Sequence, residues 1–247
     1  MRVLILGGTG EAAELAAKVA NIQGIEVISS LAGRTREPSI PLGDFRVGGF
    51  GGVAGLAEYL HQMNINLLID ATHPFATQMA LNGADAAIRV NIPRLKLMRP
   101  PWKAVNGDRW LEVDNIKSAA SVLENQSKRV FLTIGRQEIG TFAHLNQIWF
   151  LMRMIDPPEQ NALVPPGVFL CDRGPFLLEN EREILIQHRI DTIVSKNSGG
   201  VATYAKIIAA RELKLQVVMV KRPPVPPGEQ VTDVDAAVTW LLQHSHG

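Results

Sequence analysis

The 247-residue chain contains a single cysteine, Cys171, and this scarcity excludes two kinds of protein. One cysteine can form neither a disulfide scaffold nor a cysteine-ligated metal cage. Sparse cysteine fits a reducing compartment, so we expect the protein to be cytoplasmic. No spacing of histidine, cysteine and carboxylate residues is typical of a metal site, and we therefore expect no bound metal.

Net charge and long apolar runs are also absent. The formal charge of +1 gives no electrostatic support for binding nucleic acid or an anionic membrane. No apolar run approaches the ~18 residues of a membrane-spanning helix. The first run, residues 3–6, has no basic segment before it and is followed by glycine, so we expect no signal peptide. The length suffices for one large domain or two modest ones.

Several catalytic signatures are missing as well. The chain has no G-x-S-x-G turn, no Cys/His pair and no P-loop lysine, which leaves acyl transfer and ATP chemistry without support. Its two tyrosines, Tyr59 and Tyr204, are not followed four residues later by lysine. This argues against a short-chain dehydrogenase or a related sugar epimerase, which would carry a Tyr-x-x-x-Lys pair.

What the chain does contain is a glycine-rich turn close to its first residue. Residues 3–6 are typical of a buried parallel strand and residues 11–20 of a helix. Between them, Gly8 and Gly10 begin a G-x-G-x-x-A pattern that fits the dinucleotide fingerprint. Gly8 permits a tight turn, and Gly10 lets a pyrophosphate approach the backbone at a helix N-terminus. The pattern predicts a dinucleotide site, an ordinary strand-to-helix turn being the alternative.

Arg34 and Arg36 follow the second expected strand, residues 25–31, where a dinucleotide fold places its cofactor selector. An acid in this position would bind the ribose 2′-hydroxyl of NAD, whereas an arginine suits the 2′-phosphate of NADP. We therefore expect Arg34 to bind that phosphate and NADPH to be the cofactor, with NADH as the alternative. Otherwise both arginines are solvated loop charges.

Strands and helices alternate along the rest of the chain, which predicts parallel sheets with helices on both faces. Residues 94–124 and 216–243 repeat one order of strand, Arg-Pro-Pro, loop and helix. We interpret the chain as an α/β protein of two Rossmann-like parallel-sheet domains, residues 1–126 and 127–247, with the active-site cleft between them. A single doubly wound sheet is the alternative. Further strands are expected over 66–70, 94–98, 129–134, 147–155, 168–171, 192–195 and 216–220, and further helices over 53–63, 76–89, 115–124, 178–188, 202–213 and 234–244.

Two loops in the first half suggest contacts with the cofactor. Residues 47–52 are glycine-rich, and glycine costs conformational entropy, so we expect Gly49 and Gly51 to lie close to a ligand; a flexible turn would have the same composition. Thr72 and His73 follow the strand that ends at Asp70. An imidazole can donate a proton near neutral pH, which makes His73 a candidate acid; a histidine bonded to the backbone is the alternative.

The second half places cationic side chains and glycine-rich turns at strand ends. Lys196 ends a strand, and Ser198 and Gly199 follow it with backbone amides expected at a helix N-terminus. Together these groups predict a pocket for a substrate with several carboxylates or phosphates, separate solvated charges being the alternative. The residues expected to bind substrate are Arg136, Arg173, Asn197, Ser198, Gly199 and Lys206.

Several motifs in fixed order resemble one family. They are Leu6-Gly-Gly-Thr-Gly-Glu11, Val47-Gly-Gly-Phe-Gly-Gly52, Asp70-Ala-Thr-His-Pro-Phe-Ala76, Arg99-Pro-Pro-Trp102, Arg173-Gly-Pro-Phe176, Ser195-Lys-Asn-Ser-Gly-Gly200, Ala209-Ala-Arg211 and Lys221-Arg222-Pro223. The chain resembles the precorrin-6A reductases of cobalamin biosynthesis, including their cobalt-precorrin counterpart. The resemblance covers residues 4–223, and the motifs at 70–76 and 195–200 are far more specific than the glycine turn alone.

The resemblance implies a reductase that moves a hydride from a reduced nicotinamide to one C=C bond of the macrocycle, giving precorrin-6B. Its partner would be a tetrapyrrole-derived small molecule with many carboxylates, with or without cobalt. His73 or Lys196 would supply the proton. A non-catalytic NADP-sensing module and another Rossmann-type dehydrogenase or epimerase are the alternatives, and the sequence indicates no oligomeric state. The cofactor would contact Gly8, Thr9, Gly10, Glu11, Arg34, Gly49, Gly51 and Thr72.

Overall fold

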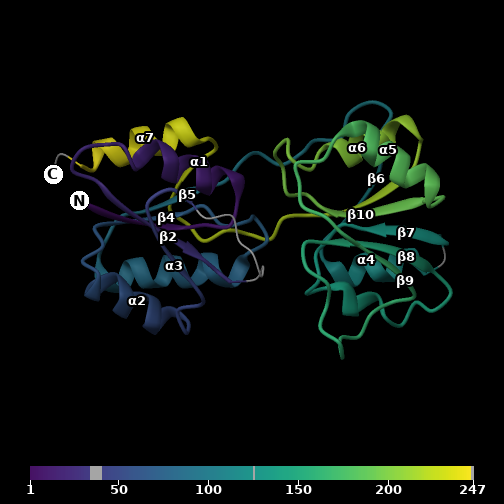
Figure 1. The fold of residues 1–247 in the computed structure, drawn as a ribbon, viewed down its shortest axis with the longest axis horizontal. Coiled ribbons are helices and arrows are strands. Elements are labelled where there is room, and N and C mark those ends of the chain that lie inside the picture. Colours follow the sequence, from purple (N-terminus) through teal and green to yellow (C-terminus); the bar gives the residue numbers. More distant parts are fainter. Residues whose placement is uncertain (34–40, 125, 246–247) are drawn as a thin grey trace. The chain divides into compact units, whose positions relative to one another are not determined.

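The computed structural model describes residues 1–33, 41–124 and 126–245, which form two six-stranded sheets with helices packed against both faces (Figure 1). Every strand pairing in this part of the chain is parallel. The predicted α/β class with two Rossmann-like halves is therefore confirmed. Arg34 and Arg36, the expected cofactor selectors, lie outside the described residues.

The first sheet contains the N-terminal strand at its centre. Its order is β12-β5-β4-β1-β2-β3. Side chains alternate along β1: Val3 and Ile5 pack with α1 and α7, whereas Leu4 and Leu6 pack with α2 and α3. Helices α1 and α7 lie on one side of the sheet, and α2 and α3 lie on the other (Figure 1). Both faces of the central strands are thus covered, as all-parallel sheets require. The strands are β1 (Arg2–Leu6), β2 (Glu26–Leu31), β3 (Asp44–Val47), β4 (Leu67–Asp70), β5 (Arg94–Leu97) and β12 (Glu229–Val231), and the helices α1 (Gly10–Val19), α2 (Val53–Gln62), α3 (Thr77–Val90) and α7 (Val234–Gln243).

The second sheet has the order β6-β11-β10-β7-β8-β9. Phe131, Ile193 and Val217 from its central strands pack with α5 and α6 in one apolar core. Helix α4 and the short 3-10 helix η1 lie on the opposite face (Figure 1). The strands are β6 (Arg109–Val113), β7 (Arg129–Leu132), β8 (Trp149–Met154), β9 (Gly167–Cys171), β10 (Thr192–Lys196) and β11 (Gln216–Val220), and the helices α4 (Ile116–Leu123), η1 (Ile139–Phe142), α5 (Leu178–Gln187) and α6 (Ala205–Glu212).

The chain divides into a first unit, Met1–Pro100 with Pro223–Gly247, and a second unit, Pro101–Arg222. The predicted division into 1–126 and 127–247 is wrong, because β6 pairs with β11 in the second sheet and β12 pairs with β5 in the first. The chain passes from one unit to the other at each of the two repeated Arg-Pro-Pro segments, 99–101 and 222–224. The repeat that suggested two domains therefore marks the two crossings.

Gly55 in α2 provides a test of the packing around the glycine-rich loop 47–52. A Cβ at this position would lie 1.8 Å from the backbone oxygen of Phe50, which no side-chain rotation can relieve. Gly55→Ala should therefore lower the free energy of unfolding by about 1–3 kcal/mol, although alanine is normally the better helix former. Gly83→Ala should cost less, because its Cβ would be 3.2 Å from the movable Leu6 Cδ1. Urea unfolding measures both; equal stability of Gly55→Ala and the parent would contradict the packing.

Candidate functional site

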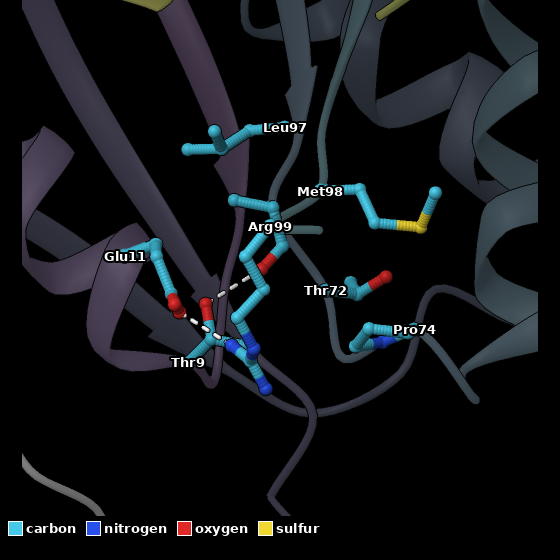
Figure 2. A pocket seen from close by; sticks show the side chains of 8 residues that line it. Thr9, Glu11, Thr72, Pro74, Leu97, Met98 and Arg99 are labelled. Atoms are coloured by element: carbon cyan, nitrogen blue, oxygen red, sulfur yellow. Dashed lines mark hydrogen bonds and ion pairs between the residues drawn. The ribbon is translucent and has the colours of Figure 1, made fainter. Parts of the chain in front are cut away.

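A pocket opens at the carboxyl ends of β1, β4 and β5 in the first unit (Figure 2). Its empty space is about 190 Å³, which includes open solvent. The residues that line it are Thr9, Glu11, Ala71, Thr72, Pro74, Leu97, Met98 and Arg99.

The glycine turn forms one wall of this pocket. Gly8 has a φ of +101°, which favours glycine, and no atom lies within 4 Å of an ideal Cβ on Gly8 or Gly10. The Thr9 hydroxyl caps α1 by accepting from the Ala12 amide at 3.1 Å, and it donates to the Ala71 oxygen at 2.8 Å. This hydroxyl holds the turn against the loop after β4. The backbone of Thr9, rather than its side chain, is therefore the part that can contact a ligand.

The turn fits a dinucleotide phosphate. The amides in the first turn of a helix have no acceptor within the helix, and the helix N-terminus carries partial positive charge. Space is open above Gly8 and Gly10, where a Cβ would otherwise obstruct an approaching phosphate. The backbone amides of residues 8–11 can therefore bind an anion, as the sequence predicts.

Glu11 and Arg99 form an ion pair across the pocket. Arg99 Nη1 lies 2.6 Å from Glu11 Oε2, and the two side chains are 18% and 27% exposed (Figure 2). The sequence analysis expected Glu11 to bind the cofactor and did not single out Arg99. Arg99 follows β5, which lies next to β4, and β4 in turn pairs with β1, the strand before the glycine turn. An arginine after such a strand was the available signal.

A buried charged cluster lies at the ends of β4 and β5. Lys96 Nζ is 3.0 Å from Asp70 Oδ1, and the same oxygen accepts from the Thr72 hydroxyl at 2.6 Å and the Thr72 amide at 3.0 Å. Asp70 is fully buried and Lys96 is 1% exposed. Desolvation makes such a pair a weak source of stability, so its role is to fix the backbone at Thr72. Sequence reasoning missed Lys96; a lysine in a strand covered on both faces signals a carboxylate partner.

His73 follows Thr72 and is half-buried. Its Nδ1 accepts a hydrogen bond from the Phe75 amide at 3.2 Å. An accepting Nδ1 carries no proton, so the neutral ring holds its proton on Nε2. The backbone hydrogen bond that the sequence analysis kept as the alternative is therefore present, and it leaves Nε2–H as the group that can act as an acid.

The glycine-rich loop 47–52 is held by Arg46 of β3. Arg46 Nη1 donates to the Gly48 oxygen at 2.9 Å, Nη2 donates to the Gly49 oxygen at 3.0 Å, and the guanidinium lies 3.8 Å from the Phe50 ring centre. No atom lies within 4 Å of an ideal Cβ on Gly49 or Gly51. One side of the loop is thus open, as contact with a ligand would require, and Arg46 is a further residue that the sequence analysis did not identify.

In the second unit, the loop of residues 196–200 is fixed by its own side chains and by both crossing segments. Asn197 Oδ1 accepts from the Trp102 amide at 2.8 Å, and Asn197 Nδ2 donates to the Trp102 oxygen at 3.0 Å. Trp102 Nε1 donates to the Gly200 oxygen at 2.8 Å. Arg222 donates to the oxygens of Asn197 and Ser198 at 2.8 and 2.9 Å.

These bonds correct two expectations about the 196–200 loop. The Asn197 side chain was expected to bind substrate, but both ends of its amide group bind Trp102. Helix α6 begins at Ala205 rather than directly after Gly200, so the loop amides are not at its N-terminus. Gly199 and Gly200, with φ values of +67° and +75°, form the turn instead.

Lys196 and Arg136 lie at neighbouring strand ends, because β10 pairs with β7. Lys196 forms an ion pair with Glu138, which the sequence analysis did not single out, and the Lys196 side chain is 17% exposed. Arg173 follows β9, which β8 separates from β7. The structure thus brings Lys196 and Arg136 together at one edge of the sheet and places Arg173 farther along it.

Lys206 is not at the surface. It is 4% exposed, donates to the Thr203 oxygen at 2.9 Å and lies 5.1 Å from the Trp102 ring centre. Burial, together with the nearby charge of Arg153 and against the smaller opposing effect of Glu181, lowers the pKa of Lys206 to about 7. Arg153 and Glu181 form a buried two-pronged ion pair, with Nη2 2.9 Å from Oε2. The enclosed ammonium group does not favour the expected contact of Lys206 with a substrate carboxylate, which stays a prediction.

Among the described residues, no group of three or more histidine, cysteine, aspartate or glutamate side chains could hold a metal ion. In the same residues, no helix is both long enough and apolar enough to cross a membrane.

Comparison with known proteins shows the family. A model of the family described as Precorrin-6x reductase CbiJ/CobK matches residues 2–242. The chain belongs to the precorrin-6x reductase family. It is 49% identical over 241 residues to the precorrin-6A reductase of Rhodococcus erythropolis, covering 97% of each chain, and 41% identical over 243 residues to that of Rhodobacter capsulatus, covering 98% and 96%. The solved structure of a CobK precorrin-6A reductase matches with a TM-score of 0.94 at 40% identity, covering 99% of this chain and 97% of that one.

Membership makes the protein an oxidoreductase and selects among the interpretations of its sequence. The resemblance drawn from the motifs is confirmed, and an enzyme is favoured over a non-catalytic NADP-sensing module or a sugar epimerase. The motifs that carry the resemblance also have defined structural roles in this reductase: Trp102, Asn197 and Arg222 belong to three of them and together fix the 196–200 loop.

Asn197→Asp tests the structural role of this side chain in the reductase. The substitution places a carboxylate oxygen opposite the Trp102 backbone oxygen, where Nδ2 now donates at 3.0 Å. We expect the free energy of unfolding to fall by about 1–3 kcal/mol, measured in urea, because a buried donor is lost. The exposed Asn146→Asp change is the matched control. Unchanged stability with a raised KM would instead show that Asn197 binds substrate.

Lys206→Met tests the burial of the ammonium group. The pKa of Lys206 is 10.5 in the unfolded chain and about 7 in the folded protein, so the parent loses stability as pH falls from 10.5 to 7. As pH rises from 7 to 10.5, the unfolding free energy of the parent minus that of Lys206→Met should therefore increase, by up to about 1.4 kcal/mol per pH unit. The exposed Lys103→Met change is the control. A difference that is flat with pH would contradict the burial.

Proposed function

We propose that the protein reduces one C=C bond of metal-free precorrin-6A with NADPH, giving precorrin-6B in cobalamin biosynthesis. The observation that carries this proposal is the end-to-end similarity to two precorrin-6A reductases. The open glycine turn and the cationic strand ends of the second unit agree with it, because the reaction needs a dinucleotide and a polycarboxylate ring.

The proposed cofactor contacts belong to the first unit. The backbone amides of Gly8, Thr9, Gly10 and Glu11 bind phosphate oxygens at the N-terminus of α1. When bound, the reduced nicotinamide supplies the hydride. Gly49, Gly51 and Thr72 border the nicotinamide side. Gly49 and Gly51 lie on the open face of the 47–52 loop, and the Asp70–Lys96 pair holds the backbone at Thr72 in place. Arg34 binds the 2′-phosphate and so favours NADPH over NADH.

The proposed substrate contacts belong to the second unit. Arg136, Arg173 and Lys196 at strand ends offer cationic groups to the ring carboxylates, and the amides of Ser198 and Gly199 offer hydrogen bonds. Asn197 and Lys206 serve this site indirectly. They fix Trp102 from two sides, and Trp102 in turn fixes the 196–200 loop.

Reduction of a C=C bond adds a hydride to one carbon and a proton to the other. His73 is the proposed proton donor; it would act as the imidazolium and give up the Nε2 proton, and in that form Nδ1 no longer accepts from the Phe75 amide. Lys196, which forms an ion pair with Glu138, is the rival donor. Because the cofactor brings the hydride chemistry, the remaining work of the protein is to orient both reactants and supply this proton.

His73→Ala should lower kcat by about 10²–10⁴-fold with little change in the KM for NADPH, since a positioned acid contributes that much to the rate. His61→Ala, at an exposed position of α2, is the control. The measurement is the initial rate of NADPH oxidation with precorrin-6A under anaerobic conditions. Turnover within a few-fold of the parent would show that His73 is not the acid, and a large loss in Lys196→Met would then assign the proton to Lys196.

The proposed reaction itself is tested by anaerobic mixing of the protein, NADPH and metal-free precorrin-6A. Nicotinamide oxidation and the visible spectrum of the macrocycle are followed together. Simultaneous changes in equal amounts support the proposal, and mass spectrometry should show a product heavier by two hydrogens. A parallel reaction with NADH should be slower. Binding of NADPH without any change in either signal overturns the proposed substrate, and the same mixture with the cobalt-containing ring then identifies the alternative one.

A further inference from the structure

The Arg99–Glu11 ion pair differs from the other ion pairs at the strand ends of the first unit. Asp70 and Lys96 are almost completely buried and cannot exchange partners without exposing a charge. Arg99 and Glu11 are partly exposed and both line the pocket, together with the glycine turn (Figure 2). A pair of this kind gains little net energy from its own attraction, so a stronger anion can replace one partner.

The position of Glu11 explains what that anion is. Glu11 lies in the first turn of α1, where a carboxylate interacts favourably with the partial positive charge of the helix N-terminus. Gly8 and Gly10 leave open the space through which a phosphate would approach the same helix end. The Glu11 carboxylate is therefore an anion already bound beside the phosphate position, and Arg99 is the cation that binds it.

We propose that Arg99 is a ligand of the cofactor's pyrophosphate, and that Glu11 holds the Arg99 guanidinium in position until the pyrophosphate replaces the carboxylate. The inference rests on the proposed use of NADPH. A guanidinium offers several N–H donors in one plane and binds phosphate oxygens in pairs, as it binds a carboxylate. Arg99 thus adds a side-chain contact to the backbone amides that the glycine turn provides.

The two members of the pair should have opposite effects on cofactor binding. Removal of Arg99 removes a charged phosphate ligand, so Arg99→Ala should weaken NADPH binding by about 10- to 100-fold. Removal of the Glu11 charge removes a competitor and retains the backbone amide, so Glu11→Gln should strengthen NADPH binding several-fold. Because Glu11 competes only through Arg99, the double variant should bind NADPH no better than Arg99→Ala alone. Arg99→Lys should recover part of the affinity.

The experiment is titration of each variant with NADPH, followed by nicotinamide fluorescence at fixed ionic strength. A second probe, adenosine 2′-monophosphate, carries no 5′-phosphate and therefore no part of the pyrophosphate, and its affinity should change less than about 3-fold in Arg99→Ala. The matched controls are Arg2→Ala and Glu26→Gln. This pair has a similar distance of 2.7 Å in the same unit but lies at the amino ends of β1 and β2, and neither change should alter NADPH binding.

The outcomes separate the inference from the function on which it rests. Failure of the parent protein to bind NADPH would refute the proposed cofactor. The inference is overturned if the parent binds NADPH and Arg99→Ala binds it equally well. It is also overturned if Arg99→Ala binds NADPH normally but has a higher KM for precorrin-6A. Weaker NADPH binding by Glu11→Gln also overturns it, because Glu11 would then assist the cofactor directly rather than compete with it. Thermal unfolding confirms that each variant is folded.

Discussion

Every strand pairing in the described part of the chain is parallel, and the position of each functional residue depends on this constraint. Parallel neighbours run in the same direction, so the loops that follow them begin at one edge of each sheet. The glycine turn, Thr72 and Arg99 follow β1, β4 and β5 and therefore line one pocket. Arg136 and Lys196 share an edge of the second sheet for the same reason. Helices must cover both faces of such sheets, which leaves the strand ends as the positions where polar groups meet a ligand.

The sequence was sufficient for the elements whose side chains repeat with a clear period, and insufficient for most of the sheet edges. The core strands and seven long helices lie within a few residues of their predicted limits. Strands β3, β6 and β12 were missed; β3 and β12 are short, exposed edge strands with no continuous apolar run, as in Glu229–Val231. Two of them, β6 and β12, explain the wrong domain boundary. Without these two strands, the exchange of strands between the two halves of the chain is not visible, and residues 125–128 were interpreted as the junction.

Prediction of the site succeeded where a residue acts through its backbone and failed where a side chain acts through a distant partner. The open space above Gly8 and Gly10 follows from local turn chemistry, which a sequence shows directly. The roles of Asn197 and Arg99 depend on residues 95 and 88 positions away in the chain. Lys206 has the composition of an anion ligand, but its burial beneath Trp102 is a property of tertiary packing alone. The motif Arg99-Pro-Pro-Trp102 contains two such side chains. Arg99 contacts Glu11, directly after the glycine turn, and Trp102 contacts Gly200 of the 196–200 loop.

The double crossing of the chain also sets the order in which the protein can be completed during translation. The second unit is one continuous segment, whereas the first unit lacks β12 and α7 until the second unit has been synthesised. Val234, Ala237 and Leu241 of α7 are fully or almost fully buried against the face of the first sheet that includes Val3 and Ile5. At roughly 5–20 residues per second, this apolar face waits roughly 7–30 seconds for its cover after β5 has been synthesised. The glycine turn is thus made before the second unit, and the core that supports it closes only after the second unit is made.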